Sequence, residues 1–180
     1  PTGELKVAVS TLGVETLDPT IYGNTTAALL SGGMLETLIG ITPKGELIPG
    51  IAEKWSMSAD GLSWTYNLRK DVKFHDGSAL TAEDVKFSIG RFQDPKATSS
   101  NAALIRTTVK DVVVTDPYTV VISLAKLNVE FPYYSSRLLG AEGSVMPKAY
   151  IEKVGVAAWA KQPVGSGPWK FLSQTPGANL

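Results

Sequence analysis

Alternation of apolar and polar residues predicts two β-hairpins in this chain. Large apolar side chains occupy every second position of the stretch Leu62–Arg69, which is the period of a strand with one buried face. The Asp60-Gly61 pair before this strand is a strong hairpin signal. A second hairpin is predicted around Asp116-Pro117, between the valine-rich strands Asp111–Thr115 and Tyr118–Leu124.

The apolar side chains of the first hairpin are assigned to the core. Leu62, Trp64, Tyr66 and Leu68 all point to one side of the predicted strand, so we expect them to be buried together. The alternative is that the aromatic rings form a platform on which a ligand stacks.

The clearest helix start lies at Thr81. Threonine is a favoured N-cap, and Asp84 three residues later resembles the acidic member of a capping box. Leu80 and Val85 occupy the two positions of a hydrophobic staple. The helix is expected to end before Pro95, because the residue that precedes a proline disfavours helical geometry.

Another helix is predicted from Asn24 or Thr25 to about Leu38, where apolar residues recur at spacings of three and four. It contains Ser31-Gly32-Gly33, although each glycine inside a helix costs about 1 kcal/mol relative to alanine. We attribute these glycines to close packing against a neighbouring element, with close approach of a ligand as the alternative.

The other predicted elements complete a mixed pattern of hairpins and helices. They are a strand at 4–9, short strands between 39 and 51, a surface loop at 93–104, a helix at 131–139, a strand at 142–146, helices at 148–154 and 156–161, and a strand beginning at 169. This mixture predicts an α+β or mixed α/β fold.

Composition narrows the class of protein. The chain has 180 residues, 43% of them hydrophobic, with 17 basic and 17 acidic side chains and no cysteine. A chain of this size and composition can bury a core, which argues against disorder. Without cysteine there is no disulfide, zinc–thiolate site or thiol nucleophile. Zero net charge argues against nucleic-acid binding, and the apolar runs are too short for a membrane-spanning helix.

Catalytic chemistry has little support in the sequence. The single histidine, His75, is the only residue through which a Ser-His-Asp triad could form, and its neighbour Asp76 does not by itself orient an imidazole. Gly165-Ser166-Gly167 lacks the lysine and the helix start of a phosphate-binding loop. We therefore expect no cofactor and no metal site, and a binding role rather than an enzyme.

One long stretch resembles a known family. It runs from Ile51-Ala52-Glu53-Lys54-Trp55-Ser56 through Asp60-Gly61-Leu62-Ser63-Trp64 to Phe74-His75-Asp76-Gly77-Ser78-Ala79-Leu80-Thr81-Ala82-Glu83-Asp84-Val85-Lys86-Phe87-Ser88-Ile89. Further pieces follow in the expected order: Leu17-Asp18-Pro19, Leu35-Glu36-Thr37-Leu38, and Pro163-Val164-Gly165-Ser166-Gly167-Pro168-Trp169-Lys170-Phe171. Together they resemble the extracellular solute-binding proteins that include the dipeptide-, oligopeptide- and nickel-binding components of ABC importers.

The resemblance implies a domain organisation. Family members are longer and have three domains, so this chain is expected to be an N-terminal piece. Residues 1–44 would open domain I, residues 45–163 would form a smaller antiparallel domain II, and residues 164–180 would return to domain I. The family captures a solute between lobes by hinge closure, without covalent chemistry.

The resemblance also implies where a ligand binds. Tyr22 lies where the family has residues that face the cleft, and its alternative role is packing within the turn. Glu15 and Thr16 are weaker candidates, as are Arg137 and the stretch Glu142-Gly143-Ser144 near the return to domain I.

Partners and location follow from the same resemblance. The expected partners are a small solute (a peptide, opine, sugar or metal chelate) and an ABC permease in the inner membrane. The expected protein is a monomer in the periplasm, or alternatively a lipid-anchored extracytoplasmic one. Two other functions remain open: a regulatory relative that acts on a permease or chemoreceptor, and a hydrolase that uses His75.

Overall fold

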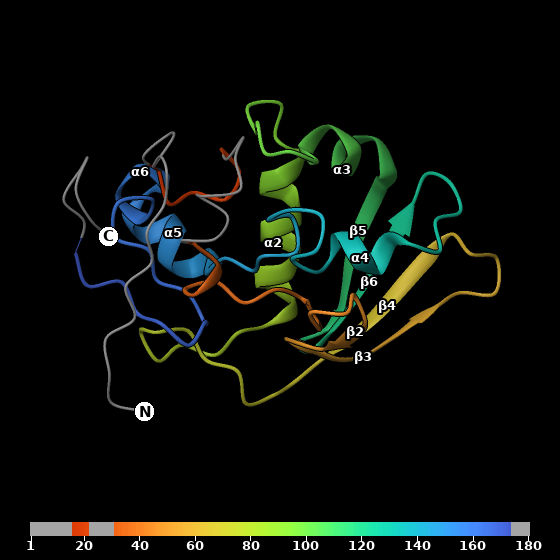
Figure 1. The fold of residues 1–180 in the computed structure, drawn as a ribbon, viewed down its shortest axis with the longest axis horizontal. Coiled ribbons are helices and arrows are strands. Elements are labelled where there is room, and N and C mark those ends of the chain that lie inside the picture. The colour runs from red at the N-terminus through yellow and green to blue at the C-terminus, as the bar shows by residue number, and fades with distance from the viewer. Residues whose placement is uncertain (1–15, 22–30, 174–180) are drawn as a thin grey trace.

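A computed structural model describes residues 16–21 and 31–173 of the chain (Figure 1). The fold is a mixed α+β one, as predicted, in which runs of strands are followed by runs of helices. The strands are β1 (Ile39–Ile41), β2 (Leu47–Pro49), β3 (Ala52–Met57), β4 (Ser63–Leu68), β5 (Val109–Asp116) and β6 (Thr119–Leu124). The helices are α2 (Ala82–Gln93), α3 (Ala102–Thr108), α4 (Phe131–Tyr134), α5 (Lys148–Val154) and α6 (Val156–Trp159).

Both predicted hairpins are confirmed, and they form one antiparallel sheet. The strand order is β3-β4-β6-β5, so β4 and β6 join the two hairpins at the centre of the sheet. In the first turn, the Asp60 carboxylate accepts hydrogen bonds from the Ser58 hydroxyl at 2.6 Å and the Leu62 N–H at 3.0 Å. Gly61 follows with a φ of +71°, a conformation that glycine adopts without strain.

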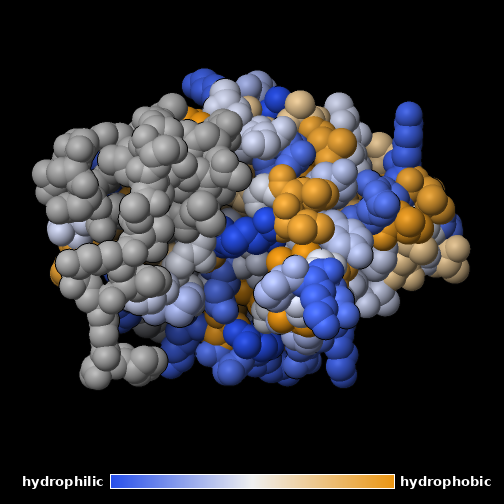
Figure 2. Space-filling model, viewed as in Figure 1, coloured by the Kyte–Doolittle hydropathy of each residue, from blue (hydrophilic) through white to orange (hydrophobic). Residues whose placement is uncertain are grey.

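The predicted core face of β4 is correct in its middle and wrong at its start. Tyr66 and Leu68 are fully buried, and Trp64 is half-buried with its indole N–H on the carbonyl of Asn128 at 3.1 Å. Leu62 is instead 42% exposed, because it belongs to the turn and precedes the first residue of the strand. Figure 2 shows apolar surface at that end of the molecule, on the right of the view.

Helix α2 crosses one face of the sheet and joins it to the rest of the chain. It contacts β5 and β6 on one side and α5 on the other, as Figure 1 also shows. The start predicted at Thr81 is confirmed, since the Asp84 carboxylate accepts the Thr81 N–H at 2.8 Å. The other oxygen of Asp84 accepts the Lys148 N–H at 2.9 Å, which fixes the start of α5. Burial nevertheless raises the pKa of the Asp84 carboxyl above its usual value.

The segment after α6 crosses the chain that precedes β1. The N–H of Gly167 donates to the Met34 carbonyl at 2.9 Å, and the N–H of Trp169 donates to the Gly33 carbonyl at 3.0 Å. A Cβ atom added to Gly33 would lie 2.8 Å from the Trp169 ring, so close packing accounts for this glycine. The backbone near Gly33 has already left the helical conformation, and the helix predicted to reach Leu38 is therefore too long.

Four other predicted elements need correction. The helix predicted at 131–139 is only the four residues of α4, which ends where Ser135 and Ser136 turn the chain back toward Thr37. The strand predicted at 142–146 is a single bridge between Ser144 and Thr37. The loop predicted at 93–104 contains the start of α3, and residues 169–173 are not a strand. The strand predicted at 4–9 lies outside the described residues.

Candidate functional site

The predicted site residues fall on two segments, and the structure describes most of them. Glu15 and Tyr22 lie outside the described residues, but the short loop between them, 16–21, is described. Thr16 accepts the N–H of Asp18 on its hydroxyl oxygen at 3.2 Å. Arg137 and Glu142-Gly143-Ser144 lie on the second segment, between α4 and α5.

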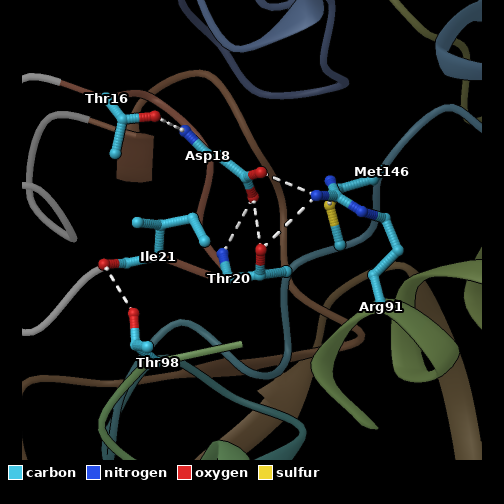
Figure 3. Close-up of polar contacts among 7 residues, drawn as sticks. All are labelled: Thr16, Asp18, Thr20, Ile21, Arg91, Thr98 and Met146. Atoms are coloured by element: carbon cyan, nitrogen blue, oxygen red, sulfur yellow. Dashed lines mark hydrogen bonds and ion pairs between the residues drawn. The ribbon is translucent and has the colours of Figure 1, made fainter. Parts of the chain in front are cut away.

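A buried ion pair anchors the 16–21 loop (Figure 3). The Asp18 carboxylate lies 2.6 Å from a guanidinium nitrogen of Arg91, and the two side chains are only 4% and 14% exposed. The other carboxylate oxygen accepts the N–H of Thr20 at 3.0 Å and its hydroxyl at 2.8 Å. This local turn is typical of aspartate, whose side chain bonds the backbone two residues ahead.

The loop is then joined to the chain that follows α2. The carbonyl of Thr20 accepts the N–H groups of both Thr98 and Ser99, at 2.8 Å and 3.0 Å. Two residues further on, Asn101 donates its N–H to Glu142 at 2.8 Å. The 98–101 stretch therefore links the two segments that carry the predicted site residues.

The stretch Glu142-Gly143-Ser144 is buried and packed into the fold. Glu142 accepts hydrogen bonds from the backbone and the side chain of Asn101, which begins α3. The carbonyl of Gly143 accepts the Leu38 N–H at 2.8 Å, and Ser144 pairs with Thr37. In this conformation these three residues hold the chain between α4 and α5 against the start of α3 and against residues 37–38. Their contact with a ligand stays a prediction.

Arg137 lies at the same edge and is partly exposed. One of its guanidinium nitrogens donates to the carbonyl of Leu35. A Cβ atom added to Gly32 would lie 3.0 Å from another of its nitrogens, so the side chain lies across the turn that precedes β1. The second predicted segment thereby reaches the chain just after residues 22–30.

His75 has both ring nitrogens engaged with backbone groups. Nδ1 accepts the Gly165 N–H at 3.3 Å, and Nε2 lies 2.8 Å from the carbonyl of Gly167. Since Nδ1 is an acceptor, the proton resides on Nε2 and is donated to that carbonyl. A third bond runs from the N–H of His75 to the Gly165 carbonyl at 2.7 Å. His75 therefore fastens the 165–167 crossing to its own turn, and neither nitrogen is free to act as a base.

The hollows of the described part of the chain differ in size and in openness. A cavity of about 20 Å³ lies behind Glu142-Gly143-Ser144 and is lined mainly by apolar side chains. That volume suits one water molecule and is far too small for a solute. Two larger hollows, of about 340 and 530 Å³, are open to solvent, one beside His75 and Tyr150 and one beside Lys70 and Tyr118.

Residues 16–21 and 31–173 also limit the chemistry that this part of the chain can carry. Within these ranges, no three histidine or acidic side chains come together in a way that could hold a metal ion. The helices of the same ranges are all too short or too polar to pass through a bilayer.

The chain is similar to known solute-binding proteins. The chain matches the model of bacterial extracellular solute-binding proteins, family 5 Middle, over residues 46–180. It is 30% identical over 158 residues to the periplasmic oligopeptide-binding protein OppA of Escherichia coli K12, a match that covers 79% of this chain and 28% of OppA.

Two further likenesses agree with this match. The chain is 30% identical over 168 residues to the glutathione-binding protein GsiB of Escherichia coli O1:K1, covering 93% of this chain and 32% of GsiB. Among solved structures it resembles AgaA of A. tumefaciens R10 in complex with agropinic acid, with a TM-score of 0.80 and 31% identity over 90% of this chain and 32% of AgaA. The chain thus spans less than a third of the length of the curated relatives it matches.

Proposed function

The chain belongs to the bacterial extracellular solute-binding proteins of family 5, and we propose that it is part of a protein that captures a small solute and delivers it to the permease of an ABC importer. The observation that carries this proposal is the family match over residues 46–180, together with the TM-score of 0.80 to a binding protein in complex with its solute. Capture is non-covalent, by closure of lobes around the solute.

Residues 1–44 open domain I, residues 45–163 form domain II, and residues 164–180 return to domain I in this proposal. The contacts of Gly167 with Met34 and of Trp169 with Gly33 support this division. They bring the segment before the proposed domain II beside the segment after it, as expected where a chain leaves one domain and re-enters it.

The proposed solute-binding surface is formed by the 16–21 loop, with Glu15, Thr16 and Tyr22, and by the edge near Arg137 and Glu142-Gly143-Ser144. The 98–101 stretch supports this assignment, because it is hydrogen-bonded to both segments. The two larger hollows described above are open to solvent. We propose that further chain closes over this surface in the whole protein, since the relatives are much longer and a solute site usually encloses most of its ligand.

The proposed solute is a small polar organic molecule. The relatives are named for oligopeptides and for glutathione, and the solved neighbour holds agropinic acid. Peptides and opines share carboxylate groups and hydrogen-bonding nitrogen atoms. We propose that the protein works outside the cytoplasm, in the periplasm, because the relative OppA is named as a periplasmic protein. We propose that it works as a monomer with no cofactor.

We propose no enzymatic role. The bonds of His75 to Gly165 and Gly167 support this view, because a general base needs a free nitrogen within reach of the proton it abstracts.

Thermal unfolding of the full-length protein against peptides, opines, sugars and metal chelates tests the proposal. A solute at a hundredfold excess over its Kd stabilises a protein by about 2.7 kcal/mol. We expect one class to raise the melting temperature and to be recovered chemically intact. If every class leaves the melting temperature unchanged, or if the solute is recovered as hydrolysis products, the proposal is wrong.

A further inference from the structure

Arg91 makes more contacts than an ion pair requires. It lies in the last turn of α2, and besides Asp18 its guanidinium reaches the Thr20 hydroxyl at 3.4 Å and the Met146 sulfur at 3.2 Å. The same guanidinium lies 5.6 Å from the centre of the Trp159 ring, within the range of a cation–π contact. Figure 3 shows Arg91 reaching from its helix to the 16–21 loop.

These contacts fix the position of one carboxylate. Asp18 is held from one side by Arg91 and from the other by the N–H and hydroxyl of Thr20. The carboxylate therefore sets the backbone conformation of the loop at Thr20, whose carbonyl then receives the two N–H groups of the 98–99 stretch. Arg91 acts on the loop through Asp18, and the loop is only a few residues long.

The ends of that loop are the residues proposed to touch the solute. Thr16 is at one end, next to Glu15, and Tyr22 follows Ile21 at the other end. We propose that Arg91 is a positioning residue for solute binding: through Asp18, and through its contact with the Thr20 hydroxyl, it fixes the conformation of the 16–21 loop, which leads in sequence to the residues proposed to touch the solute. This inference rests on the proposed function, and the residue itself need not touch the solute.

The chemistry of the side chain explains why arginine occupies this position. A planar guanidinium can stack on an aromatic ring while its edge donates to a carboxylate, whereas a lysine ammonium is a single point charge. Lysine would keep the charge opposite Asp18 and lose the simultaneous contacts with Trp159 and Thr20. We therefore expect Arg91→Lys to be intermediate between the wild type and Arg91→Gln.

The test uses the full-length protein with Arg91→Gln, Arg91→Lys, Asp18→Asn and a control, Arg69→Gln. Arg69 also lies near acidic side chains, 3.9 Å from Glu36 and from Asp71. It is 40% exposed, however, and directly follows the last residue of β4. Amide hydrogen exchange is followed in peptides that cover 16–21 and 97–101, with peptides from β4 and β6 as internal references.

We expect exchange at 16–21 and 97–101 to rise about tenfold or more in Arg91→Gln and Asp18→Asn, less in Arg91→Lys and not at all in Arg69→Gln, with β4 and β6 unchanged. Exchange at 16–21 equal to that of the wild type would overturn the proposal. So would an equal rise in β4 and β6, because Arg91 would then support the whole fold rather than the loop.

Binding of reduced glutathione and of trialanine to the same proteins, followed by stopped flow, gives the functional arm. For a probe that binds, we expect Arg91→Gln to accelerate dissociation about tenfold with little change in association. Unchanged dissociation despite a mobile loop would overturn the inference while leaving the proposed function intact. If neither peptide binds the wild type, that result counts against peptides as the solute class. The exchange measurement then decides by itself whether Arg91 positions the loop.

Discussion

Replacing His75 tests how the crossing segment is held to the rest of the protein. His75→Ala removes an acceptor from the N–H of Gly165 and a donor from the carbonyl of Gly167, while the backbone bond from residue 75 to the Gly165 carbonyl can remain. Both glycines are buried. A buried polar group left without a partner costs about 1–3 kcal/mol.

The two unpartnered groups together account for a loss of about 2–6 kcal/mol, a large share of a typical stability of about 5–15 kcal/mol, and the lost packing of the ring adds to it. His75→Phe provides the matched variant, because it keeps a ring of similar size and loses both hydrogen bonds. We expect His75→Phe to recover only the packing part of the loss. The assay is urea unfolding followed by tryptophan fluorescence.

The protonation state of the ring gives an independent check. The two bonds require a neutral His75 that carries its proton on Nε2, which nitrogen-15 chemical shifts of the imidazole report directly. A ring protonated on Nδ1 would refute the assignment of donor and acceptor. So would a loss below about 0.5 kcal/mol in His75→Ala, because that is the size of an ordinary surface substitution.

Four other substitutions probe the fold in different ways. Gly165→Ala would drive a Cβ atom into a backbone carbonyl and should lower the urea midpoint sharply, whereas Gly90→Ala, on an open helix surface, should raise stability by about 1 kcal/mol. Tyr66→Phe leaves the hydroxyl of Ser135, now 3.1 Å away, without its partner and should cost about 1 kcal/mol in the same assay. Burial raises the pKa of Asp84, so the folded state binds the proton of this carboxyl more tightly than the unfolded state does. The stability of the wild type relative to Asp84→Ala should therefore be greatest at acid pH and should fall as the pH rises through the raised pKa. A difference that grows with pH in urea titrations from pH 3 to 7 would mean that the hydrogen bonds to this carboxylate outweigh its burial.

Features with a local signature could be predicted from the sequence. Asp60-Gly61 and Asp116-Pro117 identified both hairpins, and Thr81 with Asp84 located the start of α2. These signals work because a turn or a helix cap is decided by residues a few positions apart. The error at Leu62 has the same origin, since the alternating pattern continues into the turn although the strand does not.

The contacts that organise the candidate site had no such signature. Asp18 and Arg91 are separated by 73 positions, and His75 and Gly165 by 90. Leu17-Asp18-Pro19 is part of the family resemblance, but nothing near it in sequence identifies Arg91 as the partner of Asp18. Pairing over such distances depends on how α2 lies against α5 and α6, which only the packed structure determines.

The burial of Glu142 is a similar case. The pattern predicts a strand at 142–146, and no residue near Glu142 in sequence indicates what would pair with its carboxylate. The carboxylate is buried because Asn101, at the start of α3, offers it two hydrogen bonds. Because α3 was not predicted, the hydrogen bonds from Asn101 to the Glu142 carboxylate could not be predicted either.

Mass spectrometry of the full-length protein tests the central claim, non-covalent capture of a solute, most directly. The protein is purified without denaturation and its mass is measured under native conditions and again after unfolding. We expect one small organic molecule per protein in the native spectrum, released unchanged on unfolding. A covalent adduct that survives unfolding, or a native spectrum in which the protein remains bare after incubation with peptides, opines, sugars and metal chelates, would contradict it.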